Sequence, residues 1–105
     1  MIGIYKIENL INGKVYIGQS VHIERRWQEH CRDSAESVVA EAIRKYGVEN
    51  FSFKVLKECS IEELDELEKL YIKEYGSLVP FGYNVDSGGS SNHTSFAVYD
   101  FVEFQ

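Results

Sequence analysis

Apolar and polar residues alternate in two short segments near the start of the chain, residues 3–5 and 16–18, which lie on either side of Asn12-Gly13. An Asn-Gly pair between such segments predicts a β-hairpin. A two-residue loop would place Tyr16 opposite Asn9 and, because side chains alternate along strands, would put Tyr5 and Tyr16 on one face. The other face, which we expect to meet the core, would carry Ile4, Val15 and Ile17. A change of one residue in loop length would break this arrangement.

Apolar residues at helical spacing follow the hairpin and predict a first helix from an N-cap at Ser20 to about Arg32. Its buried stripe would be Ile23, Trp27 and Cys31. Arg26 and His30 are four residues apart and so lie together beside this stripe. Taken alone, Arg26 fits a solvated ion pair with a glutamate of the same helix, and His30 fits a half-buried surface position.

A second helix is predicted over residues 36–46, with Gly47 as the residue of positive φ that ends it. Its apolar side would be Val38, Val39, Ala42, Ile43 and Tyr46. Strict alternation over residues 51–55 then predicts a half-buried third strand. Residues 80–82 predict a turn, residues 83–85 a short last strand, and residues 87–91 a flexible Gly/Ser stretch.

A capping box at Ser60–Glu63 predicts a third helix that ends near Gly76. Its apolar stripe would be Ile61, Leu64, Leu67, Tyr71 and Tyr75. Glu68 falls inside this stripe, although most other acidic residues of the helix lie outside it. A carboxylate on a core-facing stripe is paired, protonated or bound to a metal. The alternative is a boundary glutamate that reaches water at the edge of the core.

Composition and charge narrow the possibilities. The chain has 105 residues, enough for one domain with one core, and a net charge of −6, which argues against a protein that coats nucleic acid over its whole surface. Basic residues nevertheless gather between residues 25 and 45, where Arg25, Arg44 and Lys45 predict a local basic patch. Apolar runs are too short to cross a bilayer, the start of the chain does not resemble a secretion signal, and two unpaired cysteines suit a reducing compartment. We therefore expect a cytoplasmic protein that does not enter membranes.

The sequence motifs resemble the GIY-YIG nuclease family. Gly3-Ile4-Tyr5 is followed ten residues later by Tyr16-Ile17-Gly18, and four further motifs arrive in the family's order. They are residues 24–30, residues 42–47 (Ala-Ile-Arg-Lys-Tyr-Gly), Glu68 and residues 82–85 (Gly-Tyr-Asn-Val). The match covers about residues 1–89 and is most similar to the phage and intron homing endonucleases, which implies the cytoplasm of a bacterial or phage-infected host cell. The resemblance implies an α+β fold, a small three-stranded antiparallel sheet flanked by about three helices.

The resemblance also implies an activity: hydrolysis of phosphodiester bonds in DNA with one divalent ion, Mg²⁺ or Mn²⁺. By position, Glu68 matches the family's metal ligand, Arg26 its catalytic arginine and His30 a histidine of many members. Tyr5 and Tyr16 match its paired tyrosines. We expect Tyr5 to be the general base, acidified by Arg26 or the metal or passing its proton to His30, with Tyr16 as the alternative. Substrate-binding candidates are Gly18, Arg25, Arg44, Lys45 and Asn84, and we expect Asn84 to hold a loop or a tyrosine hydroxyl in place.

These motifs divide the chain into a nuclease-like domain at residues 1–89 and a Ser/Gly linker with an apolar tail at residues 90–105. Residues 96–104 are dense in apolar side chains, which predicts packing on the domain, self-association or contact with a protein partner. The alternative to an endonuclease is a catalytically weak or inactive nucleic-acid-binding or regulatory module on the same fold, or a structure-specific nuclease.

Overall fold

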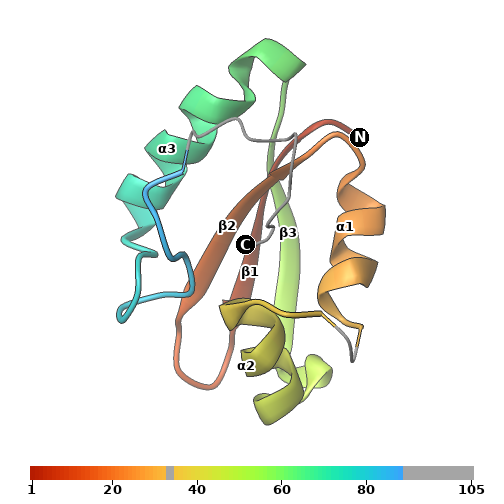
Figure 1. Cartoon of the computed structure of the whole chain (residues 1–105), viewed down its shortest axis with the longest axis vertical. Coiled ribbons are helices and arrows are strands. Elements are labelled where there is room, and N and C mark those ends of the chain that lie inside the picture. Colours follow the sequence, from red (N-terminus) through yellow and green to blue (C-terminus); the bar gives the residue numbers. More distant parts are fainter. Residues whose placement is uncertain (33–34, 89–105) are drawn as a thin grey trace.

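A computed structural model describes residues 1–32 and 35–88. Three strands, β1 (Gly3–Asn9), β2 (Val15–Ser20) and β3 (Phe51–Glu58), form one antiparallel sheet in the order β2-β1-β3. The helices are α1 (Ile23–His30), α2 (Val38–Tyr46) and α3 (Leu64–Tyr75), with short 3₁₀ turns η1 (Val48–Asn50) and η2 (Ile61–Glu63) before β3 and α3. The expected α+β fold of three antiparallel strands and three helices is therefore confirmed (Figure 1).

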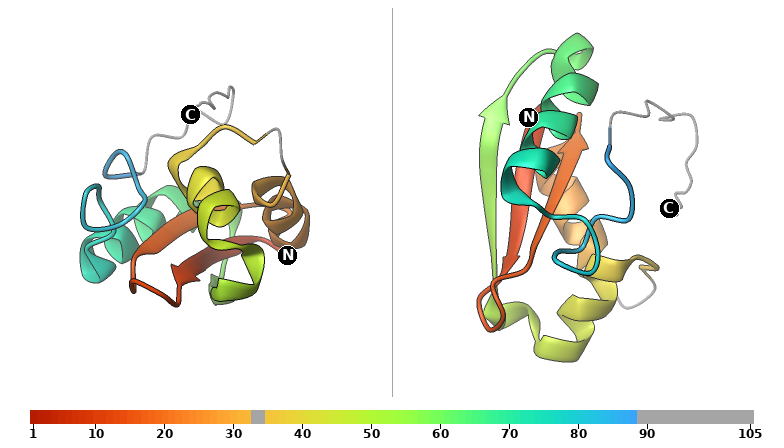
Figure 2. Two further views of the ribbon diagram at one scale, coloured as in Figure 1. Left: turned by 90° about the horizontal axis from the view of Figure 1, so that it is seen from below. Right: turned by 90° about the vertical axis from the view of Figure 1, so that its left-hand side faces the viewer.

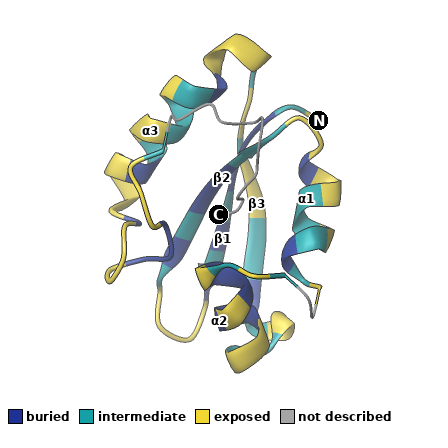
Figure 3. Cartoon of the chain, in the orientation of Figure 1, coloured by how far each residue is buried: buried dark blue, intermediate teal, exposed yellow. Residues whose placement is uncertain are grey.

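Both faces of the sheet are covered, so the protein has two apolar cores. On one face Tyr5 and Ile7 pack with Ile23 of α1 and with Val39 and Ile43 of α2. On the other face the core consists of Ile4, Val15, Ile17, Leu64 and Ile72, the last two from α3. Figure 2 shows α1 and α3 on opposite sides of the sheet, and Figure 3 shows that buried positions are concentrated in β1 and β2, whereas β3 is mostly intermediate or exposed. The expectation of a single core face, with the tyrosines displayed on the other, is thus wrong, because α1 and α2 cover the tyrosine face.

The hairpin differs from the expected one in its loop but not in its faces. Asn9 pairs with Lys14 across a four-residue loop, in which Gly13 has a φ of 80°. Tyr16 is therefore opposite Ile7 and not Asn9. Because the loop is longer by two residues and not by one, the alternation of side chains is preserved, and Tyr5 and Tyr16 still lie on one face.

Helix boundaries also shift slightly. Ser20 is not the N-cap of α1; its hydroxyl accepts a hydrogen bond from the His22 N–H at 2.9 Å, and the helix begins only at Ile23. Helix α2 begins two residues later than expected, because the Ser37 hydroxyl caps it by accepting from the Ala40 N–H at 3.1 Å. Gly47 ends α2 with a φ of 94°, as expected.

The third strand continues to Glu58, three residues beyond the expected end. The capping box at Ser60–Glu63 is confirmed and opens η2, which leads into α3. The stripe of α3 is rotated from the expected one: Ile61 and Tyr75 are exposed, whereas Ile72 is buried.

The segment after α3 is a loop that lies against β2. Instead of the expected strand at residues 83–85, a single bridge joins Leu78 and Asn84, and the turn at residues 80–82 is present. Among residues 1–32 and 35–88, no helix is long and apolar enough to span a membrane. Cys31 and Cys59 are free thiols. Most of the predicted Gly/Ser stretch, the 89/90 boundary and the tail lie outside the described residues.

Candidate functional site

Tyr5 lies directly across from Gly18 in the β1–β2 pair. Its ring is fully buried, and a Cβ built on Gly18 would collide with the Cζ and hydroxyl of Tyr5 and come within 2.9 Å of a Tyr16 ring carbon. Only a residue without a side chain therefore leaves room for both phenols at this position. Substrate binding by Gly18 stays a prediction, and the structure shows that this glycine provides the space in which the two tyrosines lie.

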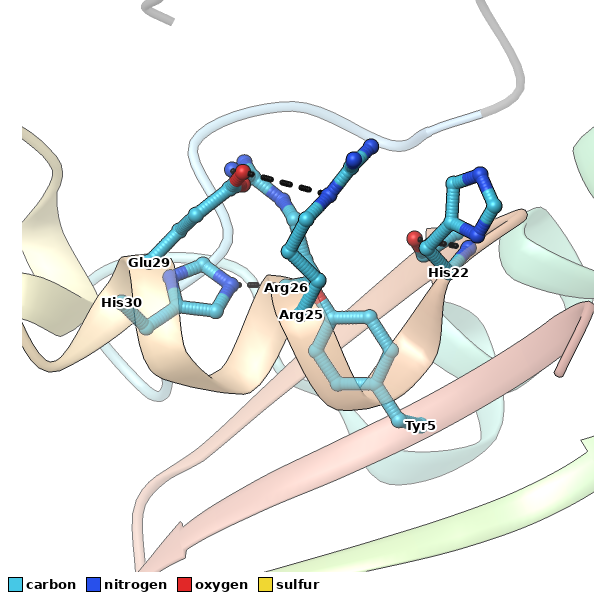
Figure 4. A network of polar contacts seen from close by, with 7 residues as sticks. Tyr5, His22, Arg25, Arg26, Glu29 and His30 are labelled. Carbon is cyan, nitrogen blue, oxygen red and sulfur yellow. Dashed lines mark hydrogen bonds and ion pairs between the residues drawn. The ribbon is translucent and has the colours of Figure 1, made fainter.

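The Tyr5 hydroxyl is hydrogen-bonded to Nε2 of His30, 2.8 Å away on α1 (Figure 4). Burial raises the pKa of Tyr5 well above its ordinary value, Tyr16 raises this pKa further, and the Arg26 guanidinium opposes the rise. Burial and the charge of Arg26 lower the pKa of His30 well below its ordinary value. A neutral phenol therefore faces a neutral imidazole at neutral pH. Arg26 alone therefore does not acidify Tyr5. Of the other two expected routes, acidification by a metal stays a prediction, and transfer of the proton to His30 has its hydrogen bond in place.

Tyr16 is the more accessible of the two phenols. Its residue is half-buried, its ring lies edge-on to His30 with centroids 5.3 Å apart, and its centroid is 6.2 Å from that of Tyr5. Burial raises the pKa of Tyr16 to about 12; Arg26 opposes this, Glu68 and Asp86 add to it, and hydrogen bonding to Tyr5 lowers it. Of the two tyrosines, Tyr16 is thus the one with surface exposed to solvent.

Arg26 comes from the same helix as His30 and lies one turn before it. Its Nη1 donates to Oε1 of Glu29 at 2.9 Å, and 43% of its side chain is exposed. Although burial acts to lower its pKa, the two phenols and Glu29 raise this pKa overall, so the guanidinium is permanently charged. Arg26 therefore forms the expected ion pair within the helix and also lies beside the two tyrosines.

Glu68 enters the site from α3, on the far side of β2. Its Oε1 accepts a hydrogen bond from Nε2 of Gln19 at 2.9 Å. A Cβ on Gly88 would lie 3.2 Å from the same oxygen, so the loop after α3 passes close to this carboxylate. The negative charge of Glu68 raises the pKa of both tyrosines, which places it within electrostatic reach of them. Five side chains from β1, β2, α1 and α3 thus converge beside the edge strand.

Residues 1–84 match the family model of the GIY-YIG catalytic domain, which is most of the chain. The chain belongs to the GIY-YIG family. It is similar to the structure of the catalytic domain of homing endonuclease I-TevI, with a TM-score of 0.71 and 31% identity, over 82% of this chain and 99% of that one.

Curated relatives include intron-associated endonuclease 1 of Enterobacteria phage T4, 33% identical over an alignment of 90 residues that covers 79% of this chain and 36% of the relative. Another is the MSV199 domain-containing protein 146R of Invertebrate iridescent virus 6, 40% identical over an alignment of 82 residues that covers 71% of this chain and 34% of the relative. This GIY-YIG chain therefore spans about a third of the length of these relatives.

The other basic candidates of the GIY-YIG domain come from α1 and α2. Arg25 is exposed and its Nε lies 3.8 Å from Oε2 of Glu29, so both arginines of α1 reach toward that carboxylate (Figure 4). Arg44 donates to the Ala35 carbonyl at 2.8 Å and to the Arg32 carbonyl at 3.4 Å, and so holds the segment between α1 and α2. Nζ of Lys45 lies 5.3 Å above the Tyr46 ring.

Asn84 has a structural role in this GIY-YIG domain. Its amide oxygen accepts from the Ile17 N–H at 2.9 Å and from the Ser77 hydroxyl at 2.7 Å, and its nitrogen donates to the Ile17 carbonyl at 2.8 Å. Asn84 is buried and its hydrogen bonds join the loop to β2, which is the loop-holding role expected from the sequence. The loop is held a second time by Tyr83, whose hydroxyl accepts from Nδ2 of Asn9 at 3.0 Å.

Oxygen donors of the kind that Mg²⁺ prefers are present at Glu68 and at Asp65, one turn earlier on α3. No group of three or more His, Cys, Asp or Glu side chains suited to a metal occurs within residues 1–32 and 35–88. This set fits Mg²⁺, which is commonly bound through one or two carboxylates and retains several waters, better than it fits Zn²⁺.

Gln19 is the site residue that the motifs did not reveal. A signal for it exists in the alternation of β2, because Gln19 has the same parity as Val15 and Ile17, which face α3. A polar residue on that face calls for a polar partner on the helix that covers it.

Proposed function

We propose that this chain is a metal-dependent endonuclease that hydrolyses phosphodiester bonds in DNA, of the homing-endonuclease type. The observation that carries the proposal is the convergence of two phenols, an imidazole, a guanidinium and a carboxylate from four separate elements at one edge of the sheet. This set contains a proton acceptor, a cation for the phosphate and an anion for a metal, as phosphodiester hydrolysis requires.

Arg26 binds a nonbridging phosphate oxygen in this proposal. Its planar guanidinium offers paired donors that a lysine lacks, and its charge persists at any pH at which the protein is folded. It is half-exposed and adjacent to both phenols, so a phosphate bound there lies next to Tyr16.

The proton of the attacking water is removed by a relay of three side chains, Tyr16, Tyr5 and His30. Tyr16 is the accessible phenol, Tyr5 is buried behind it, and Tyr5 is hydrogen-bonded to Nε2 of His30. Burial raises the pKa of both phenols, so forming a phenolate would cost free energy. In the proposed route each phenol accepts one proton as it gives up its own, from the water to Tyr16, then to Tyr5 and finally to His30, so neither phenol becomes charged. A phosphate on Arg26 neutralises one of the two causes that lower the pKa of His30, so substrate binding makes the imidazole a better acceptor.

Glu68 would hold the divalent ion, with Mg²⁺ or Mn²⁺ as its occupant. When bound, such an ion supplies polarisation of the phosphate and stabilisation of the leaving oxygen. Glu68 itself contributes the negative charge that attracts the ion and fixes it relative to β2 through Gln19.

Cleavage of supercoiled plasmid DNA in Mg²⁺ at low salt tests the proposal. Wild type should nick or linearise the plasmid, EDTA should stop the reaction, and Glu68→Gln should lower the rate at least a hundredfold. Glu74→Gln, an exposed glutamate on the same helix, is the matched control and should keep the wild-type rate. If wild type leaves the plasmid intact across Mg²⁺ and Mn²⁺, the proposal is refuted in favour of a binding module. Equal nicking by wild type and Glu68→Gln would point to a contaminating nuclease.

A further inference from the structure

Gln19 connects the sheet to the acidic side of α3. It is the fifth residue of β2, opposite Ile4, and its side chain reaches Asp65 and Glu68. The single amide nitrogen Nε2 donates to Oδ1 of Asp65 and to Oε1 of Glu68, each at 2.9 Å. An amide nitrogen carries two hydrogens, so one goes to each carboxylate.

This contact fixes the orientation of Glu68. A glutamate has three rotatable side-chain bonds, and a half-buried one on a helix surface samples several rotamers unless something holds it. Gln19 holds Oε1 from one side, and the backbone near Gly88 borders the same oxygen from another. Asp65 in turn holds the amide of Gln19, because residues three apart on a helix lie on the same face.

We propose that Gln19 is a positioning residue that orients Glu68 for a divalent cation. The inference rests on the proposed function only in taking Glu68 as the metal ligand. A partner that holds a metal-binding carboxylate by a hydrogen bond commonly determines both metal affinity and geometry.

The neutrality of Gln19 matters as much as its reach. A lysine at this position would also donate to both carboxylates, but its positive charge would compete with the cation for them. A glutamate would add a third negative charge and donate nothing. A neutral amide orients Glu68 without adding a charge that competes with the metal or repels the carboxylates.

Binding of Mn²⁺ to the whole chain, followed by the loss of the free Mn²⁺ signal in electron paramagnetic resonance, tests the proposal without DNA. Gln19→Met keeps the size of the side chain and removes its donors, and should raise the dissociation constant for Mn²⁺ about 10–100-fold. Gln28→Met, at an exposed position of α1, is the matched control and should bind as wild type does. In plasmid cleavage, Gln19→Met should need about 10–100 times more Mg²⁺ for half-maximal rate, with an unchanged KM for DNA.

Gln19→Lys separates orientation from folding. It retains donors to both carboxylates and so should be at least as stable to urea as wild type, yet should bind Mn²⁺ more weakly. Equal Mn²⁺ affinities of wild type, Gln19→Met and Gln19→Lys would overturn the proposal. If wild type binds Mn²⁺ more tightly than the Gln19 variants but cleaves no DNA, the role of Gln19 is supported while the proposed nuclease function is refuted.

Discussion

Substituting Gly18 by alanine tests whether the two phenols depend on the absence of a side chain on β2. The new Cβ would be placed against the Cζ and hydroxyl of Tyr5. Tyr5 cannot move away from the new Cβ, because its side chain is fully buried and hydrogen-bonded to His30. Its ring also packs near that of Phe53, with 5.3 Å between the two ring centroids.

The expected cost has two parts. Overpacking of a buried ring costs about 1–3 kcal/mol, and loss of the contact between Tyr5 and His30 adds about 0.5–1.5 kcal/mol. Gly18→Ala should therefore lower the free energy of unfolding by about 2–4 kcal/mol, which leaves a domain of this size folded. A displacement of about 1 Å at a reacting group costs about a hundredfold in rate, so kcat per folded molecule should fall by about that factor.

Urea unfolding and plasmid cleavage measure the two effects. Gly13→Ala is the matched control: Gly13 has a φ of 80° in the hairpin loop and nothing within 4 Å of its missing Cβ, so it should lose about 1–2 kcal/mol and no kcat. In a double-mutant cycle with Tyr5→Phe, Gly18→Ala should lower the free energy of unfolding by less than it does alone, because the Tyr5 hydroxyl that collides with the new Cβ is absent. Wild-type kcat in Gly18→Ala, or strict additivity in the cycle, would refute the reasoning.

Three further predictions follow from the site. Arg26→Lys should lower kcat about 10²–10³-fold, as loss of one preorganised donor pair does, whereas Arg32→Lys, at an exposed position just after α1, should not. The pKa of His30 is lowered in the folded state, so its contribution to stability is complete above about pH 6.5 and is lost as the pH falls below that value, by up to about 1.4 kcal/mol per pH unit. In urea unfolding at a series of pH values, the free energy of unfolding of His30→Gln should therefore fall less steeply with decreasing pH than that of wild type. Asn84→Ala should cost about 2–4 kcal/mol in urea through its three hydrogen bonds, with kcat per folded molecule nearly unchanged.

Each of these has a contrary result. Equal losses in the two arginine variants would mean that Arg26 contributes only basic charge. Parallel acid slopes for wild type and His30→Gln would mean that the imidazole is protonated in the folded protein. A large fall in kcat for folded Asn84→Ala would assign that residue to substrate and not to the loop.

Side-chain alternation allowed the shared face of the two tyrosines to be predicted, even though the loop length was not. The Asn-Gly pair suggested a two-residue loop, but the loop has four residues. An error of two residues moves Tyr16 from opposite Asn9 to opposite Ile7 and leaves its face unchanged. The local pattern therefore predicted the face. The four-residue loop is accompanied by contacts that the local pattern does not contain, since Asn9 and Asn12 both donate to the distant Tyr83 hydroxyl.

Packing between distant segments accounts for what the sequence could not show. Tyr5 is buried because α1 and α2 cover its face, and this burial reverses the expected direction of its pKa shift. The rotation of α3 that buries Ile72 and exposes Tyr75 depends on how the helix meets β2. The contact of Gln19 with Glu68 joins residues 49 positions apart, and no local motif contains both.

The hydrogen bonds of Asn84 have a consequence for solubility. Strand β2 is at an edge of the sheet, and such an edge presents unpaired backbone groups on which a strand of another molecule can assemble. The side-chain amide of Asn84 binds the N–H and C=O of Ile17 as a backbone peptide group would, and the Tyr83 N–H donates to the Val15 carbonyl two residues earlier. A strand of another molecule could pair with this part of β2 only by displacing the loop, so the asparagine that holds the loop in place also protects this edge of the sheet from edge-to-edge aggregation.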